Sequence, residues 1–286
     1  MKNPYKSFVS AYLRAVEKGK ACPLGGIPAC KRPKLRAKAP KVLIFAPHPD
    51  DECIVGALAL RLLREAKMNV INVAVTQGSN KARQTARLAE LRNACDFLGF
   101  GLLTTQENGL EKISPKGREQ DPANWAAAVD IIARILDEQK PRVVFMPHAG
   151  DWNGTHIGTS LLVTEAMGKF DPAFSCLVVE TEFWAAMTTP NLMVESSAKD
   201  VADLVAATSF HVGEVQRNPY HLGQPAWMQD NVRRGAEIVG GQGGQAPNYA
   251  FATLCRLQRW SGGKLEKFFD GGKLISCQDD LKPLFT

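Results

Sequence analysis

Short apolar runs rich in β-branched residues alternate with longer segments of helical periodicity along most of the chain. The runs predict strands, and the segments between them repeat apolar residues three and four positions apart, which is typical of amphipathic helices. The predicted strands are residues 42–46, 70–76, 143–147 and 176–180. The predicted helices are residues 53–66, 81–98, 122–139, 157–168 and 199–210.

This order of strands and helices predicts an α/β fold. Strands separated by helices form βαβ units, and right-handed crossovers give a Rossmann-like, mostly parallel sheet sandwiched by helices. The last third is less regular, with a glycine-rich loop at residues 239–251 and a turn-rich hairpin region at residues 261–274. We expect an N-terminal extension over residues 1–40 and a single α/β domain over residues 41–286. Its C-terminal part, residues 212–286, is expected to be irregular, loop-rich and β-rich.

Charge is distributed unevenly along the chain. The formal net charge is +6, but residues 1–41 carry 11 lysines and arginines against one acid, and the remainder has a balance of −4. A basic arm of this kind can bind anionic surfaces, and a solvated lead-in segment is the alternative. Because no aromatic residues interleave the bases and no zinc-finger spacing occurs, the arm predicts no nucleic-acid partner.

The composition is typical of a globular protein, with 45% hydrophobic and 22% charged residues. No apolar stretch approaches the roughly 20 residues that span a bilayer, and the N-terminus lacks the apolar segment of a secretory signal. Membrane insertion is therefore not expected. The seven scattered cysteines form no CxxC pair, which favours reduced thiols and a cytoplasmic location. The oligomeric state is left open, with a homo-oligomer as one option.

Two polar segments directly follow predicted strands. PHPDDE (47–52) follows the first strand, and PHAGDWNGTH (147–156) begins where the strand at 143–147 ends. The carboxyl ends of parallel strands share one edge of a sheet, and ligands bind there. The fold is therefore expected to bring together five side chains, namely those of His48, Asp50, Asp51, Asp151 and His156.

This set of residues points to metal chemistry. Two imidazoles and a carboxylate with open coordination positions suit a catalytic zinc ion, and a second carboxylate can take a proton from water at the metal. The alternative for each segment alone is structural, with an aspartate as helix cap, Glu52 as a first-turn acid and His48 paired at the sheet edge. The two segments together favour a metal site.

The motifs resemble the PIG-L/LmbE family of zinc-dependent N-acetylglucosaminyl de-N-acetylases. The resemblance rests on APHPDDE, GSNKARQTARLAELRNACDFLG and DWNGTH, and it runs from about residue 41 to residue 211. It implies a hydrolase of linear amide bonds, with Zn²⁺ as cofactor, that removes an N-acetyl or other N-acyl group from a glucosamine-type sugar. The partner would be a small N-acetylated sugar or glycoconjugate.

The resemblance also implies roles for individual residues. His48, Asp51 and His156 would bind the zinc ion, and Asp50 would be the general base that activates the water at the metal. Arg87 would lie near hydroxyl or anionic groups of the substrate. The alternative for Arg87 is a surface ion pair with Glu90, three residues further along the helix.

Trp184 lies where a late strand is expected to end. It is a candidate to stack on a sugar ring, because the C–H face of a pyranose suits an aromatic side chain. The alternative is an ordinary tryptophan of the hydrophobic core.

The chain departs from the family pattern at Asn153, where many members have a histidine that stabilises the transition state. Asparagine can still donate a hydrogen bond to an oxyanion, but it cannot act as an acid. His211 is the preferred candidate for the proton donor, with a structural histidine as the alternative, and His148 is the second candidate. Asp151 is expected to orient His156 or the water at the metal.

Other functions stay open on the residues alone. One is a metal-dependent hydrolase of a non-sugar amide or phosphate ester, although five histidines are few for a two-metal phosphatase. Another is a metal-binding relative without activity. A Rossmann-type nucleotide-binding protein would need G-x-G-x-x-G after the first strand, where APHPDD stands. The aglycone and the choice between zinc and another divalent ion are also open.

Overall fold

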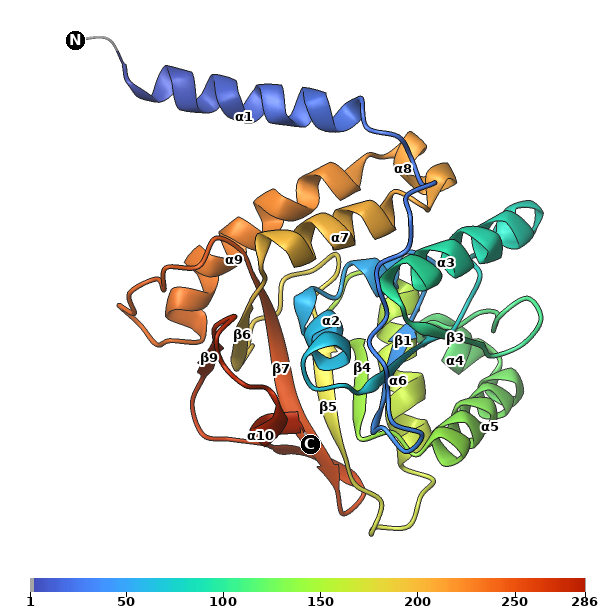
Figure 1. Ribbon diagram of the computed structural model, residues 1–286. Coiled ribbons are helices and arrows are strands. Elements are labelled where there is room, and N and C mark those ends of the chain that lie inside the picture. Colours follow the sequence, from blue (N-terminus) through green and yellow to red (C-terminus); the bar gives the residue numbers. More distant parts are fainter. Residues whose placement is uncertain (1–2, 286) are drawn as a thin grey trace.

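The apolar runs of the sequence form the centre of one large sheet, shown in Figure 1. The computed structural model describes residues 3–285. Within them the sheet has nine strands, which are β1 (Lys41–Ala46), β2 (Asn69–Ala74), β3 (Gly101–Thr104), β4 (Val143–Pro147), β5 (Cys176–Thr181), β6 (Leu192–Glu195), β7 (Ala252–Ser261), β8 (Lys264–Lys267) and β9 (Lys273–Ile275).

Helices connect the strands and cover the sheet. The α-helices are α1 (Tyr5–Lys20), α2 (Ala57–Arg64), α3 (Gln84–Leu98), α4 (Pro115–Gln120), α5 (Pro122–Gln139), α6 (Gly154–Met167), α7 (Ala198–Thr208), α8 (Val212–Arg217), α9 (Gln224–Ile238) and α10 (Lys282–Phe285). Three short 3₁₀ helices are η1 (Asp51–Cys53), η2 (Lys81–Arg83) and η3 (Tyr220–Gly223).

The strand order confirms the predicted fold class. The strands lie in the order β3-β2-β1-β4-β5-β7-β6-β9, and β8 pairs with β7. The first five strands in this order are parallel, whereas β7 runs antiparallel to both β5 and β6. The result is a Rossmann-like sheet with an antiparallel, C-terminal extension.

Both faces of the sheet are covered, which explains why the central strands are continuously apolar. Alternate residues of β1 point to opposite sides: Val42 and Ile44 pack with α2, α3 and α7, whereas Leu43 and Phe45 pack with α5 and α6. The period of two along a strand thus divides the core into two layers around the sheet.

The predicted strands and the five predicted helices are all present, and the differences lie at their ends and in the late part of the chain. The helix predicted from residue 53 begins at Ala57, because Gly56 adopts a φ of 82° between η1 and α2. A Cβ atom at Gly56 would lie 2.3 Å from Thr253 of β7. The pattern did not predict β3, β6 or α9, which are short, partly exposed or of low apolar content.

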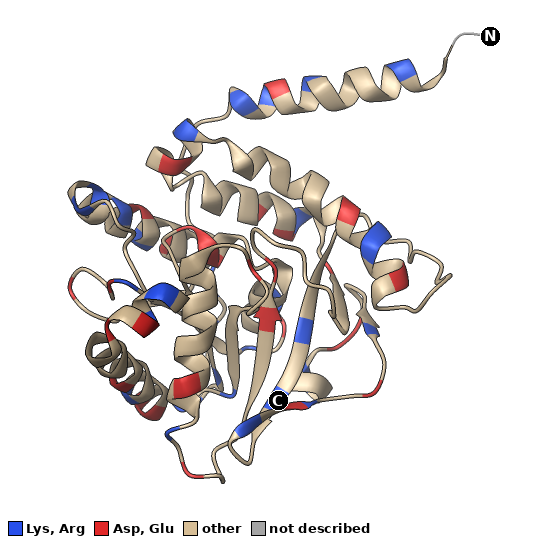
Figure 2. Cartoon of the chain, turned by 180° about the vertical axis from the view of Figure 1, so that it is seen from behind, with Lys and Arg blue, Asp and Glu red and all other residues tan. Residues whose placement is uncertain are grey.

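The basic N-terminal segment contains a helix that the pattern did not predict. Figures 1 and 2 both show α1 extending away from the rest of the molecule, and Figure 2 shows basic residues along it. Its apolar residues lie on one face and are exposed, namely Tyr5, Phe8, Val9, Tyr12 and Leu13. Among the described helices, none has both the length and the apolar character needed to cross a bilayer.

Substitution of Arg61 in α2 tests how much its hydrogen bonds to the C-terminal segment stabilise the protein. Its side chain is 1% exposed and donates hydrogen bonds to the carbonyl oxygens of Ser276 at 2.9 Å and Asp279 at 3.0 Å. We expect Arg61→Met to lower the free energy of unfolding by about 2–3 kcal/mol, because these carbonyls lose their charged donor. Urea denaturation followed by circular dichroism measures the change.

The matched control is Arg233→Met. Arg233 is exposed and, within residues 3–285, forms its ion pair with Asp230, one turn away on α9. Such surface pairs contribute little to stability, so its unfolding midpoint should match that of the unaltered protein. If Arg61→Met and Arg233→Met unfolded at the same urea concentration, the hydrogen bonds of Arg61 would not stabilise the fold.

Candidate metal centre

The candidate site lies where the strand order of the sheet reverses. The strands β1 and β4 are neighbours in the sheet. The chain continues from β1 to β2 on one side of this pair and from β4 to β5 on the other side. A crevice forms at such a point, at the carboxyl ends of the strands. The loop after β1 contributes His48 and Asp51, and the first turn of α6 contributes His156.

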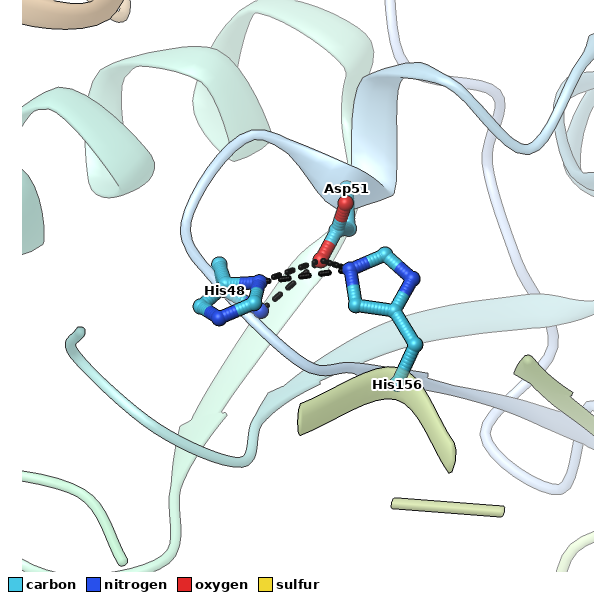
Figure 3. Close-up of side chains that lie close together, drawn as sticks. All are labelled: His48, Asp51 and His156. Carbon is cyan, nitrogen blue, oxygen red and sulfur yellow. Dashed lines mark hydrogen bonds and ion pairs between the residues drawn. The ribbon is translucent and has the colours of Figure 1, made fainter. Parts of the chain in front are cut away.

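These three side chains meet as a compact triad, shown in Figure 3. The Nδ1 atom of His48 lies 3.4 Å from Oδ2 of Asp51 and 3.3 Å from Nε2 of His156. The same Asp51 oxygen lies 3.3 Å from His156 Nε2. Two nitrogen atoms and one oxygen atom are therefore almost equally spaced, and each can donate a lone pair to the same cation.

The spacing of the triad fits a tetrahedral metal ion. Ligands bound at the zinc distances of about 2.0–2.2 Å with tetrahedral angles are separated from one another by about 3.3 Å. The electrostatic surroundings also favour a cation. Burial lowers the pKa of His156, but Asp51 and Asp151 outweigh it and raise that pKa to about 10. Burial likewise raises the pKa of Asp51, but the two histidines hold it well below its usual range.

Residues behind the triad hold His156 in place. The Oδ2 atom of Asp151 lies 3.3 Å from Nδ1 of His156, on the side of the ring that faces away from Asp51. Asn153 is the N-cap of α6, and its Oδ1 atom accepts hydrogen bonds from the backbone N–H groups of Thr155 and His156. The asparagine carbonyl thus fixes the helix turn that carries the ligand, while its NH₂ group is left for other contacts.

His148 does not join the triad. Its side chain is buried, and its Nε2 atom lies 3.0 Å from the carbonyl oxygen of Ala185. The structure therefore places it against the loop after β5, away from the candidate ligands.

Asp50 lies beside the triad in an unusual backbone conformation. Its φ of 116° is in the region that favours glycine, and such strain is concentrated at functional sites. Its Oδ2 atom accepts a hydrogen bond of 2.6 Å from the hydroxyl of Tyr220. Burial and the neighbouring carboxylate of Asp51 raise the pKa of Asp50 to about 6. The capping interpretation of these aspartates is wrong, because neither makes a side-chain cap at η1.

His211 is brought close to this loop but lies behind it. It is fully buried, and its Nε2 atom lies 2.7 Å from Oε1 of Glu52, whose other oxygen accepts from the backbone N–H of Asp50 at 3.0 Å. Burial lowers the pKa of His211, but the charges of Glu52 and Asp50 raise it overall. Through Glu52, the His211 imidazole therefore stabilises the backbone conformation of the loop that carries Asp50.

A polar cavity of about 400 Å³ opens beside the triad, with His48 in its wall. Most of the other lining residues carry hydroxyl, amide or charged groups, including Thr76, Ser79, Gln84, Arg87 and Ser114, and Leu110 and Ile113 add apolar surface. Gly158 of α6 lets the lining residues Ile113 and Ser114 pack closely on that helix, because a Cβ atom there would lie 2.6 Å from their backbone. This volume is within the usual range of ligand pockets.

Arg87 is part of that cavity and not of the surface. Its side chain is 13% exposed, donates to the carbonyl oxygen of Pro49 and lies 3.8 Å from Glu214. Glu90 instead accepts a hydrogen bond from the backbone of Gly213. The alternative of a surface pair between Arg87 and Glu90 is therefore wrong.

Aromatic residues form the other side of the site. Trp184 is 44% exposed, so the alternative of a core tryptophan is wrong. Its ring centroid lies 6.3 Å from that of Trp152 and 6.1 Å from that of Tyr220. Tyr220 was not among the predicted site residues, because nothing in the segment NPYHLG indicates a contact with a carboxylate 170 positions earlier.

The triad, Asp50, Arg87 and the polar cavity all lie between the start of β1 and the end of α6. Residues 43–167 match the PIG-L family. The family is described as GlcNAc-PI de-N-acetylase. The predicted resemblance is confirmed over this PIG-L segment. A comparison with curated proteins gives no match.

Solved structures share the fold of the PIG-L segment and of most of the chain. N,N'-diacetylchitobiose deacetylase from Pyrococcus horikoshii is 17% identical, with a TM-score of 0.56, covering 94% of this chain and 98% of that one. A deacetylase of teicoplanin biosynthesis is 18% identical, with a TM-score of 0.54 and coverages of 77% and 98%. The 4-carboxy-2-hydroxymuconate hydratase GalB from Pseudomonas putida KT2440 is 15% identical, with a TM-score of 0.57 and coverages of 76% and 95%. Because this fold also carries a hydratase, the reaction has to be argued from the site.

The geometry predicts how the site binds metal. The purified protein should bind one zinc ion, and Asp151→Asn should weaken binding about 10- to 100-fold, because the ligand His156 loses the carboxylate beside its other nitrogen. Competition with a zinc chelator measures the affinity.

The control for this experiment is Asp230→Asn, which changes an exposed aspartate on α9 that pairs with Arg233. Its zinc affinity should equal that of the unaltered protein. Undiminished affinity in a His156→Gln variant would show that zinc binds elsewhere.

Proposed function

We propose that the protein is a zinc-dependent hydrolase that removes an N-acyl group from a glucosamine-type sugar. The observation that carries this proposal is the triad of His48, Asp51 and His156, with metal-ligand spacing and a buried carboxyl group beside it, inside the PIG-L segment. The choice of an amino sugar as substrate is supported by the family match and by the polar cavity at His48.

The three residues of the triad would bind the metal ion. When bound, zinc supplies Lewis-acid stabilisation to a carbonyl oxygen and lowers the pKa of water. The remaining chemistry falls to the chain itself, because amide hydrolysis requires a proton to be taken from water and a proton to be given to the departing nitrogen.

Asp50 is suited to both proton transfers. Its carboxylate would take a proton from the attacking water, whose oxygen forms a bond to the acyl carbon. The C–N bond then breaks, and Asp50 returns the proton to the departing amine, so that a carboxylic acid and an amino sugar are released. A pKa of about 6 supports this double role, because the group can hold and release a proton close to neutral pH.

His211 fits a positioning role better than that of proton donor. Its Nε2 atom is occupied by Glu52, and the ring is fully buried. Asn153 keeps its NH₂ group for an oxyanion, since only its carbonyl oxygen is used in capping α6. Arg87 and Trp184 are proposed to contact the substrate from the polar cavity and the aromatic side, respectively.

A two-metal phosphatase is less well supported. The other group of potential ligands among the described residues is Glu52, Cys53 and His211. The Glu52 and His211 atoms are 2.7 Å apart, a hydrogen-bond distance that is shorter than the ligand spacing of the triad.

All seven cysteines are free, which supports the inferred cytoplasmic location.

The first test of the proposed function is release of acetate from a panel of N-acetylglucosaminyl compounds. Asp50→Asn should lower kcat by about 10²- to 10⁴-fold, because the amide cannot take up the proton of water. Zinc content should not change, since Asp50 is not part of the triad. Retention of full activity by this variant would show that another group is the base.

Tyr220→Phe tests how Asp50 is held. The variant keeps the ring but removes the hydroxyl that donates to Asp50 at 2.6 Å. We expect kcat to fall about tenfold, because the carboxylate is no longer fixed in the reactive orientation, with KM and zinc content unchanged. Steady-state kinetics and zinc analysis measure these quantities. A fall in zinc content would instead assign the tyrosine to the metal site.

A further inference from the structure

A second cavity lies beside the triad and differs in chemistry from the polar one. It has a volume of about 170 Å³ and is lined by Ile54, Phe183, Trp184, Tyr220, Gln224 and Trp227. Four of these side chains are aromatic rings, and none of the lining residues is an acid, a lysine or an arginine. Such a lining favours apolar groups over sugar hydroxyls.

Two lining residues of this pocket contact the triad and Asp50. The ring of Phe183 packs edge-on against the ligand His156, with centroids 4.8 Å apart and an interplanar angle of 87°. The ring of Tyr220 lines the pocket, while its hydroxyl bonds to Asp50. Two walls of the pocket are therefore side chains that touch His156 and Asp50, so the pocket is close enough to the triad for an acyl chain longer than acetyl to reach it.

The pocket is also held in shape from both sides. Its wall at Phe183 and Trp184 belongs to the loop after β5, and Trp227 belongs to α9. These two elements are tied together by Glu182, which accepts from Arg234 of α9 at 2.8 Å and from the backbone N–H of Met187 at 2.7 Å. The aromatic walls are thus fixed before any ligand binds, which lowers the entropy cost of binding.

We propose that this apolar pocket binds the acyl chain of the substrate, and that the enzyme prefers N-acyl groups longer than acetyl. The inference rests on the proposed hydrolase function. The amide bond divides the substrate into a polar sugar and an acyl group, and the site offers one polar and one apolar cavity. The first cavity, with its hydroxyl, amide and charged groups, suits the sugar, and the aromatic pocket suits the acyl chain.

The size of the pocket sets the length of chain. An apolar cavity of about 150 Å³ can hold a benzene ring, so 170 Å³ corresponds to a group of about six carbons. Burial of one methylene favours binding by about fourfold. A hexanoyl group should therefore be removed at least tenfold more efficiently than an acetyl group, even if only part of the added chain is buried.

The experiment is a series of N-acyl glucosamines with acetyl, butyryl, hexanoyl and decanoyl groups, assayed with the zinc-loaded protein. In the unaltered protein kcat/KM should rise from acetyl to hexanoyl and rise no further at decanoyl. In Trp227→Ala the ratio of hexanoyl to acetyl should fall at least tenfold. In Tyr220→Phe, which keeps the ring, the ratio should be that of the unaltered protein although kcat is lower.

Ile238→Ala is the matched control, because Ile238 is an exposed apolar residue at the end of the same helix and lies outside the pocket. Its ratio should also be unchanged. A second series keeps the acetyl group and varies the glycoside from methyl to hexyl. If Trp227→Ala alters this second series and leaves the acyl series unchanged, the pocket takes the aglycone and the acyl assignment is overturned.

Failure of the proposed function would be recognised separately. If no member of either series is hydrolysed, the affinity of the zinc-loaded protein for the N-acyl glucosamines is measured by calorimetry. A Kd that falls from acetyl to hexanoyl, and does not fall in Trp227→Ala, supports the acyl pocket in a protein with another reaction. The same Kd for all chain lengths overturns it.

Discussion

Four buried carboxyl groups, those of Asp50, Asp51, Glu52 and Asp151, crowd the carboxyl ends of β1 and β4. Burial of so much negative charge is unfavourable unless opposite charges and hydrogen-bond donors surround it. His156 lies between Asp51 and Asp151, and His211 pairs with Glu52. The hydroxyl of Tyr220 donates a hydrogen bond to Asp50. A divalent cation at the triad would complete this balance, so the electrostatics of the site agree with the proposed metal as its ligand geometry does.

The sheet allows this crowding because its strand order reverses between β1 and β4. Loops that leave in opposite directions open a crevice at that edge, and the crevice can be lined from both sides. The polar cavity lies toward the loops after β2 and β3, and the aromatic pocket lies toward the loop after β5 and the start of α9. One topological feature thus separates two binding environments, with His48 in the wall of the first and His156 packed against Phe183 of the second.

The C-terminal third of the chain contributes more to the site than its irregular pattern indicates. Antiparallel β7 extends the sheet beyond β5, and α9 packs on β7, which brings η3 and α9 to the edge of the crevice. Tyr220, Gln224 and Trp227 reach the site in this way. These residues lie outside the PIG-L segment.

The sequence alone determined four of the five parallel strands and the convergence of PHPDDE with the segment ending at His156. Continuous apolar runs are buried on both faces, and PHPDDE and the segment ending at His156 stand directly after two of them. Only the tertiary structure decided the positions of His148, His211, Trp184 and Tyr220. Local periodicity reports which face of a helix or strand is buried, but it holds no information on contacts such as that between Asp50 and Tyr220, 170 residues apart. Such contacts depend on how the late helices pack over the sheet, and that packing is settled by the summed burial of many side chains.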